Sequence, residues 1–138
     1  MVVQLPPRLR YEEGVARSFF ATLRRLHRGP VVCEPRHASW FSPSVESLLV
    51  EFEIARVAAD PPRARIDAQP GGWPGLAYFR LHGSPRMYFS AYDDAFLDDL
   101  ATRVRRLRRA GDVWVIFDNS ATRAAADNAR SLIGKLAR

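Results

Sequence analysis

Cysteine and long apolar runs are nearly absent from this sequence, and both absences exclude classes of protein. The single cysteine, Cys33, rules out an intramolecular disulfide framework and suits a reducing compartment, so we expect a cytoplasmic protein. Cys33 follows two valines, which favours a small core residue over a nucleophile. No apolar stretch approaches the roughly 20 residues of a transmembrane helix, and the N-terminus has no signal-peptide pattern. We therefore expect no membrane partner.

Several short catalytic and ligand-binding motifs are also absent. No GxSxG elbow, Walker A loop or GxGxxG loop occurs, which removes the commonest hydrolase and nucleotide-binding patterns. Metal-binding spacings such as CxxC and HxxxH are missing too. The residue types still allow a divalent metal, because oxygen and nitrogen ligands are present at Glu34, His37, Asp60, His82 and Asp118. The sequence identifies neither that metal nor any other cofactor.

Positive charge comes almost entirely from arginine. Twenty arginines and one lysine give a net charge of +6. The guanidinium fork matches phosphate geometry, so one interpretation is an anionic partner, either a phosphate-containing small molecule or nucleic acid. The other is a GC-rich genome, which enriches arginine and alanine together. In RVRRLRR (103–109), Val104 and Leu107 mark a buried stripe, so we expect these arginines on the solvated face of a helix.

Apolar runs alternate with helical patterns along the chain. In 11–27, the three- and four-residue spacing of Val15, Phe19, Leu23 and Leu26 predicts the buried stripe of a helix. The order of the elements predicts an α/β fold with about five parallel strands and four helices. We expect strands at 2–5, 31–34, 56–60, 76–82 and 113–117, helices at 11–27, 42–52, 92–109 and from 120 onward, and one long loop at 61–75.

Five strands are too few for an eight-stranded barrel, which needs about 200–250 residues. The chain also opens inside an apolar strand, with no helix or loop before it. We therefore expect residues 1–138 to form a single partial (β/α)-barrel domain that lacks its N-terminal β/α units. The open edge of such a barrel would favour a homo-oligomer.

Three apolar runs end in charged or imidazole side chains, at EPRH (34–37), RLHG (80–83) and FDN (117–119). The carboxyl ends of parallel strands meet at one edge, where binding sites form, so these groups should converge. Period-2 alternation places Tyr78, Arg80 and His82 on one side of their strand. A buried arginine needs a partner. Glu34 and Asp118 are the candidate partners for both Arg80 and Arg36.

Five segments of the chain resemble the YecE-like family, the domain-of-unknown-function family number 72. They are VVQLPPRLR (2–10), EPRHASWF (34–41), YFRLHGSPRMYFSAY (78–92), VWVIFDN (113–119) and AADNA (125–129), and their order and spacing match over nearly the whole chain. The resemblance implies a TIM-barrel-like (β/α) architecture, here incomplete, and a likeness to endonuclease IV-like, metal-dependent barrels that act on DNA. Two departures are the N-terminal β/α units, which the chain lacks, and Arg123, where the family usually carries glycine.

The polar strand ends predict a hydrolase acting on a phosphate-containing substrate or nucleic acid. Arg80 would clamp the phosphate, His82 would act as acid or base, and Glu34 or Asp118 would orient it or hold a metal. The alternatives are a non-catalytic nucleic-acid or anion-binding module, an inactive truncated family member, and a salt-bridged layer that only fixes the barrel. Loop aromatics could stack bases or merely cap the barrel. The candidate ligand-binding residues are Arg36, His37, Trp40, Tyr78, Tyr88 and Asn119.

Overall fold

A computed structural model describes residues 1–62 and 68–137. The described part is a mixed α/β fold with parallel sheets and four helices, as the alternating pattern predicts. Part of the predicted 61–75 loop, residues 63–67, lies outside the described residues. The strands are β1 (Val2–Gln4), β2 (Val31–Glu34), β3 (Ile54–Arg56), β4 (Ala58–Asp60), β5 (Gly71–Gly72), β6 (Leu76–Leu81) and β7 (Asp112–Phe117). The helices are α1 (Glu13–Leu26), α2 (Pro43–Glu51), α3 (Asp94–Leu107) and α4 (Ala124–Leu136), with a short 3-10 helix, η1 (Ala38–Trp40).

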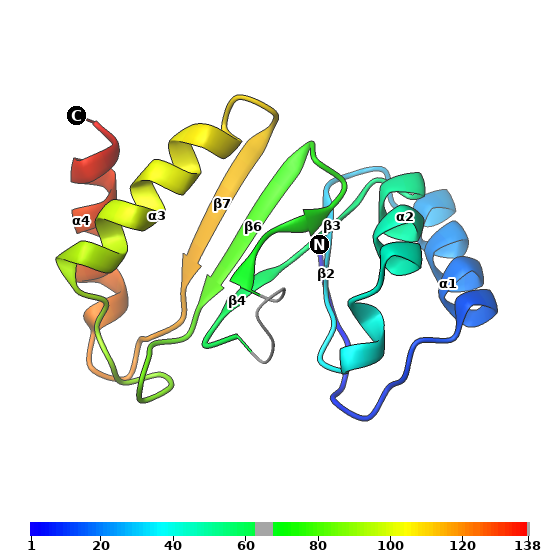
Figure 1. Ribbon diagram of the computed structural model, residues 1–138, viewed down its shortest axis with the longest axis horizontal. Helices are drawn as coiled ribbons and strands as arrows, with labels where there is room; N and C mark the ends of the chain where they lie inside the picture. The colour runs from blue at the N-terminus through cyan, green and yellow to red at the C-terminus, as the bar shows by residue number, and fades with distance from the viewer. Residues whose placement is uncertain (63–67, 138) are drawn as a thin grey trace.

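The strands form two sheets, in the orders β1-β2-β3-β5 and β4-β6-β7. Every pair is parallel except β3 with the two-residue β5. The single strand predicted at 56–60 is wrong, because the chain forms β3 beside β2 and then β4 beside β6. Only Val57 separates the two, and its backbone N–H donates to the Cys33 carbonyl at 2.9 Å. The parallel strands therefore follow one another in chain order from β1 to β7 (Figure 1).

The helices pack against one face of the strands in two pairs (Figure 1). One core cluster joins α1 and α2 to β2 and β3, with Phe20, Leu48 and Ile54 at its centre. A second joins α3 and α4 to β6 and β7 around Phe79 and Leu100. None of the described helices is long and apolar enough to cross a membrane.

Helix α1 buries a different face from the one that its spacing predicts. Val15, Phe19 and Leu26 are 65%, 45% and 79% exposed, whereas Ala16 and Phe20 are buried. Leu23 packs against the core, as predicted. The two apolar stripes are offset by one residue, or about 100° around the helix, so the periodicity is compatible with either. The predicted stripe is therefore wrong at three of its four positions.

Helix α4 begins later than predicted. Residues 121–123 form a turn, and Arg123 precedes the helix with φ 66°, in the left-handed region that favours glycine. The resemblance leads us to expect glycine at position 123, and this conformation explains why glycine would suit that position. Leu132 is buried and Leu136 packs against the same core cluster, so the last turns of α4 direct an apolar face at the core.

Helix α3 confirms the expectation for RVRRLRR except at Arg103, which is half-buried and donates from Nη2 to the Ala68 carbonyl at 2.7 Å. Val104 is buried and Leu107 packs against the core, while Arg105, Arg106 and Arg109 are exposed. This segment is therefore the outer face of an amphipathic helix.

Candidate functional site

Arg80 lies at the centre of the converging strand ends. Its Nη1 donates to Glu34 Oε2 at 2.5 Å, and its Nε and Nη2 donate to Asp118 Oδ2 at 3.0 and 2.8 Å. The predicted pairing of Arg80 with Glu34 and Asp118 is confirmed. Burial opposes the charge, but the hydrogen bonds to both carboxylates outweigh it and raise the pKa of Arg80.

Two further residues extend this ion-pair network to the neighbouring strands. Arg36 Nη2 donates to Glu34 Oε1 at 2.7 Å, so each oxygen of Glu34 faces one arginine. Arg80 Nη1 also donates to Gln4 Oε1 at 2.9 Å, which links β6 to β1. The Glu34 side chain is only 3% exposed, and the two arginines compensate its buried charge.

His82 lies beside this network without a hydrogen-bonding partner. The residue is 5% exposed, and neither ring nitrogen forms a hydrogen bond within the described structure. Nδ1 is 3.4 Å from Asp118 Oδ2. Burial, followed by the nearby Arg80 charge, lowers the pKa of His82. The imidazole is therefore neutral at neutral pH and has both a donor and an acceptor to offer.

A cavity of about 160 Å³ opens between the ends of β2, β4 and β6. Typical pockets for drug-sized ligands enclose about 300–1,000 Å³, so this one fits a phosphate or carboxylate group better than a whole nucleotide. Within the described structure, Arg80 and Asp118 do not line the cavity, so Arg80 does not reach it directly. The lining residues are Glu34, Pro35, Arg36, Ala59, Pro61, Pro62, His82, Met87 and Tyr88.

Tyr88 covers His82 from the loop after β6. Its ring meets the imidazole edge-on, with centroids 5.8 Å apart and planes at 86°. Its φ of 68° lies in the left-handed region, an uncommon conformation for a bulky residue. The backbone N–H of Tyr88 donates to the His82 carbonyl, and its own carbonyl accepts from Ala121 at 3.1 Å. These bonds from two segments hold the strained residue in place.

The loop that carries Tyr88 returns against its own start at Gly83. A Cβ at this position would lie 2.8 Å from the Ser90 carbonyl oxygen, and φ is 90°, so only glycine fits.

The model of the family described as "Protein of unknown function DUF72" matches residues 1–138. The chain belongs to the DUF72 family. No match was found among the curated proteins compared with this DUF72 chain.

Solved structures of the family share the fold. The chain is similar to a DUF72 family protein from Thermotoga maritima MSB8, with a TM-score of 0.81 and 24% identity; the match covers 99% of this chain and 57% of that one. Two structures of a DUF72 family protein from Enterococcus faecalis V583 give TM-scores of 0.79, at 21% and 23% identity, with full coverage of this chain and 58% and 61% of theirs. The chain thus spans about three-fifths of the length of these relatives.

Two of the candidate residues lie away from the cavity. Trp40 is 4% exposed, donates from its indole N–H to the Leu9 carbonyl at 3.0 Å and packs edge-on against Tyr11 in the α1–α2 core. Asn119 is fully buried and donates to the Ser90 carbonyl at 3.0 Å and to Asn128 Oδ1 at 2.9 Å. Both follow polar strand ends in sequence, but the short helix η1 and the turn before α4 direct them into the core.

His37 and Tyr78 do not line the cavity either. The His37 Nδ1 accepts from the backbone N–H of Ser39 at 3.1 Å, which caps η1. Tyr78 stacks on Trp114 with centroids 6.5 Å apart, one layer further toward the amino ends of the strands, and burial raises its pKa. Of the ten candidate residues, the cavity therefore brings together Glu34, Arg36, His82 and Tyr88, with Arg80 and Asp118 as the network beside them.

Sequence reasoning missed the residues that support the loop over the cavity. Tyr92 donates its hydroxyl hydrogen to Asp60 Oδ2 at 2.7 Å and accepts from the Gly83 N–H at 2.8 Å. The backbone N–H and carbonyl of Tyr92 are both bonded to the side chain of Asn128. Asn128 stands in AADNA, one of the segments on which the family resemblance rests, and that was the signal that could have found it.

The site does not fit the metal that the endonuclease IV-like resemblance implies. Among the described residues, no group of three His, Cys, Asp or Glu side chains is placed to hold a metal ion. The Asp118 Oδ2 accepts two bonds from Arg80, and Nδ1 of His37 is directed at Ser39. We therefore derive no chemical step that passes through a metal.

Proposed function

We propose that the cavity binds a small anionic group, a phosphate ester, and that His82 transfers a proton during its hydrolysis. The observation that carries this proposal is the His82 imidazole, which is 5% exposed, lines the cavity and has no hydrogen-bonding partner on either nitrogen. Leaving a buried polar group unsatisfied costs about 1–3 kcal/mol. A ligand that hydrogen-bonds to the imidazole would offset that cost.

Arg36 supplies the positive charge at the cavity. Its guanidinium is oriented by Glu34, and the side chain retains 21% exposure on the cavity side of the network. Charge-assisted hydrogen bonds from arginine suit phosphate oxygens. Arg80 is then a positioning residue, because its guanidinium is occupied by Glu34, Asp118 and Gln4. This assignment moves the clamping role from Arg80 to Arg36.

The lowered pKa of His82 suits a general base. Neutral His82 takes a proton from a water molecule while the water oxygen bonds to phosphorus. The bond from phosphorus to the ester oxygen breaks, and the protonated imidazole returns the proton to the leaving alkoxide. Tyr88, whose ring covers His82, limits the entry of further water.

We also propose that the sheet is part of a TIM-barrel-like (β/α) architecture. Parallel strands in chain order with helices on one face are the arrangement that such barrels repeat. The bond from Arg80 on β6 to Gln4 on β1 spans the inner face past β2 and the β3–β4 strand, which requires strong curvature. The site then lies at the carboxyl ends of the strands, where barrel enzymes hold their substrates.

Isothermal titration calorimetry with inorganic sulfate, and hydrolysis of bis(4-nitrophenyl) phosphate, would test this function. We expect His82→Gln and Arg36→Gln each to weaken sulfate binding at least tenfold and to abolish hydrolysis. Arg28→Gln, at an exposed arginine after α1, is the matched control. Wild-type binding without hydrolysis would favour the non-catalytic anion-binding alternative. If sulfate does not bind, or binds equally to all variants, the proposal fails.

A further inference from the structure

The cavity that His82 lines has a polar part and an apolar part. Glu34 and Arg36, from the end of β2, and His82, directly after β6, form the polar part. The apolar part comes mainly from the end of β4 and from the loop after β6. It consists of Pro35, Ala59, Pro61, Pro62, Met87 and Tyr88. A ligand that fills the cavity therefore meets polar groups and carbon surface together.

Three of the apolar lining residues are prolines, which have no backbone N–H. Pro61 and Pro62 follow β4 directly, so two consecutive positions beside the cavity lack a backbone donor. A phosphate oxygen that is removed from water needs hydrogen-bond donors, whereas carbon does not. The phosphate oxygens therefore belong beside Arg36 and His82, and the prolines suit an apolar group of the ligand.

The cavity has room for a phosphate group and little else. Its volume of about 160 Å³ equals about five water molecules at roughly 30 Å³ each. Phosphorus and its oxygens already occupy most of that space. The organic group of an ester must therefore leave the cavity close to the first atom that follows the phosphate. The residues at the opening then decide which organic groups are accepted.

Met87 and Tyr88 continue the apolar lining onto the surface. Together with Phe89 they form three consecutive large apolar side chains, which we call the apolar rim and which are 43%, 48% and 41% exposed. The Arg86 guanidinium lies over the Phe89 ring, 3.9 Å from its centroid, which adds a cation beside the rim. Single exposed apolar residues are ordinary, whereas a contiguous patch that reaches a polar cavity is typical of a ligand-binding site.

Hydrogen bonds of the backbone hold the apolar rim in this exposed position. The Tyr88 N–H donates to the His82 carbonyl. The Phe89 carbonyl accepts from the Thr122 hydroxyl at 3.0 Å. Because this backbone is already ordered, the loop loses little conformational entropy when a ligand packs on the rim. The apolar rim is therefore a preformed surface.

We propose that the substrate of this site is a phosphate ester whose organic group is apolar or aromatic, and that this group lies on the apolar rim. The proposal rests on the proposed function, because Arg36 and His82 bind the phosphate oxygens. The prolines and Met87 contact the first carbon atoms of the organic group. Glycerol phosphate or a sugar phosphate would bring the same charge but would place hydroxyl groups beside the prolines, which have no N–H to pair with them.

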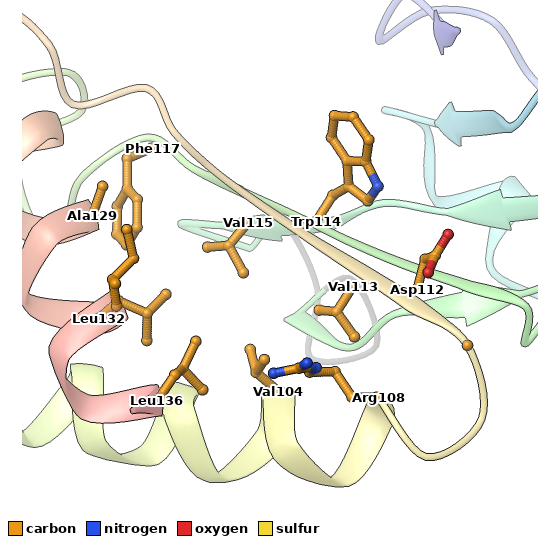
Figure 2. Close-up of a pocket in the computed structure, with 12 residues that line it drawn as sticks. Val104, Arg108, Asp112, Val113, Trp114, Val115, Phe117, Ala129, Leu132 and Leu136 are labelled. Atoms are coloured by element: carbon orange, nitrogen blue, oxygen red, sulfur yellow. The ribbon is translucent and has the colours of Figure 1, made fainter. Parts of the chain in front are cut away.

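A larger groove beside β7 offers a competing place for an apolar phosphate ester. It has a volume of about 650 Å³, and Figure 2 shows Val115 of β7 and Leu132 and Leu136 of α4 facing the same space. Arg108 lines this groove as well, so a ring and a phosphate could both find contacts there. Ile133, another lining residue, is 68% exposed and can be made polar without disturbing the core.

Isothermal titration calorimetry at pH 8 with phenyl phosphate and glycerol 3-phosphate would test the proposal, since both monoesters then carry the same charge. We expect phenyl phosphate to bind at least tenfold more tightly. Met87→Gln keeps the length of the side chain but makes it polar, and should reduce this ratio at least threefold. His82→Gln should weaken the binding of both esters. Ile133→Gln is the matched control in the groove beside β7 and should leave the ratio unchanged.

The outcomes separate this proposal from the proposed function. Equal binding of the two esters, or tighter binding of glycerol 3-phosphate, would overturn the preference for an apolar group while the phosphate site stands. So would a ratio that falls in Ile133→Gln and not in Met87→Gln, because the groove beside β7 would then hold the ring. If sulfate binds and neither ester does, only the preference fails. If none of the three binds, the proposed function fails with it.

Discussion

The central strands β2 and β3 and the outer strands β1 and β7 contain similar apolar sequences in very different surroundings. All four residues of β2 and all three of β3 are buried, whereas no residue of β1 or β7 is more than half-buried. The central strands have neighbours on both sides and helices on one face, but the outer strands have one neighbour each. The exposure of an apolar side chain here follows from its position in the sheet. Whether an apolar strand is buried or exposed is therefore decided by the number of strands beside it.

The adjacent residues Phe19 and Phe20 give the largest and most direct test of this difference. Phe20 is fully buried, so Phe20→Ala should lower the free energy of unfolding by about 3–5 kcal/mol through lost burial and a cavity. Phe19 is 45% exposed, and Phe19→Ala should lower the free energy of unfolding by less than about 1 kcal/mol. Urea unfolding of the two variants and the wild type measures both effects. Equal effects would show that α1 buries both faces within one chain.

Removing a charge from the centre should cost more than removing one from an outer helix. Arg80→Gln leaves Glu34, whose side chain is 3% exposed, with one cation fewer, and breaking a buried ion pair typically costs about 3 kcal/mol or more. Arg105→Gln on the exposed face of α3 should stay within about 0.5 kcal/mol of the wild type. Chemical denaturation of the two variants compares them. A loss for Arg80→Gln as small as that for Arg105→Gln would contradict a structural role for the network.

The smallest expected effect is a pH dependence that originates at His82. Its pKa is lowered in the folded protein, first by burial and then by Arg80, whereas the unfolded chain has the ordinary value of about 6.5. Below about pH 6.5 the unfolded state binds more protons than the folded state. The contribution of His82 to stability should therefore be fully present above about pH 6.5 and should be lost as the pH falls from there through the folded pKa.

His82→Gln should flatten this part of the stability profile. Unfolding midpoints measured at intervals between pH 5 and 8 would show the difference between the slopes. Parallel profiles for the wild type and the variant would mean that another group titrates.

Much of the fold could be predicted from the sequence because the apolar runs and helix stops are local signals. The boundaries of β2 and β6 and the stripe of α3 follow directly from such patterns. The buried face of α1 could not be predicted, because two stripes one residue apart satisfy the same spacing and only the position of the sheet selects Phe20 over Phe19. The division at Val57 also depends on neighbours distant in sequence, since its two halves pair with different strands.

Side-chain alternation and the parallel direction of the strands were enough to predict the ion-pair network of the candidate site. Arg80 meets Glu34 and Asp118 because all three stand at the carboxyl ends of parallel strands. Trp40 and Asn119 stand equally close to such ends in sequence, but local turns place them in the core. Contacts between side chains on separate strands decide that Arg36 and not Arg80 lines the cavity. No short-range pattern in the sequence encodes these contacts.

The loop over the cavity is held by the turn between β7 and α4. Asn119 bonds the carbonyl of Ser90, Ala121 bonds that of Tyr88, and the Thr122 hydroxyl donates to that of Phe89 at 3.0 Å. The cover of His82 is thus held both by the His82 carbonyl and by the turn before α4. A ligand that enters beneath Tyr88 and a rearrangement of the turn before α4 would act on one shared piece of backbone. Any coupling between the two events would be reciprocal, so a ligand that orders this turn must itself be bound more tightly when the turn is ordered.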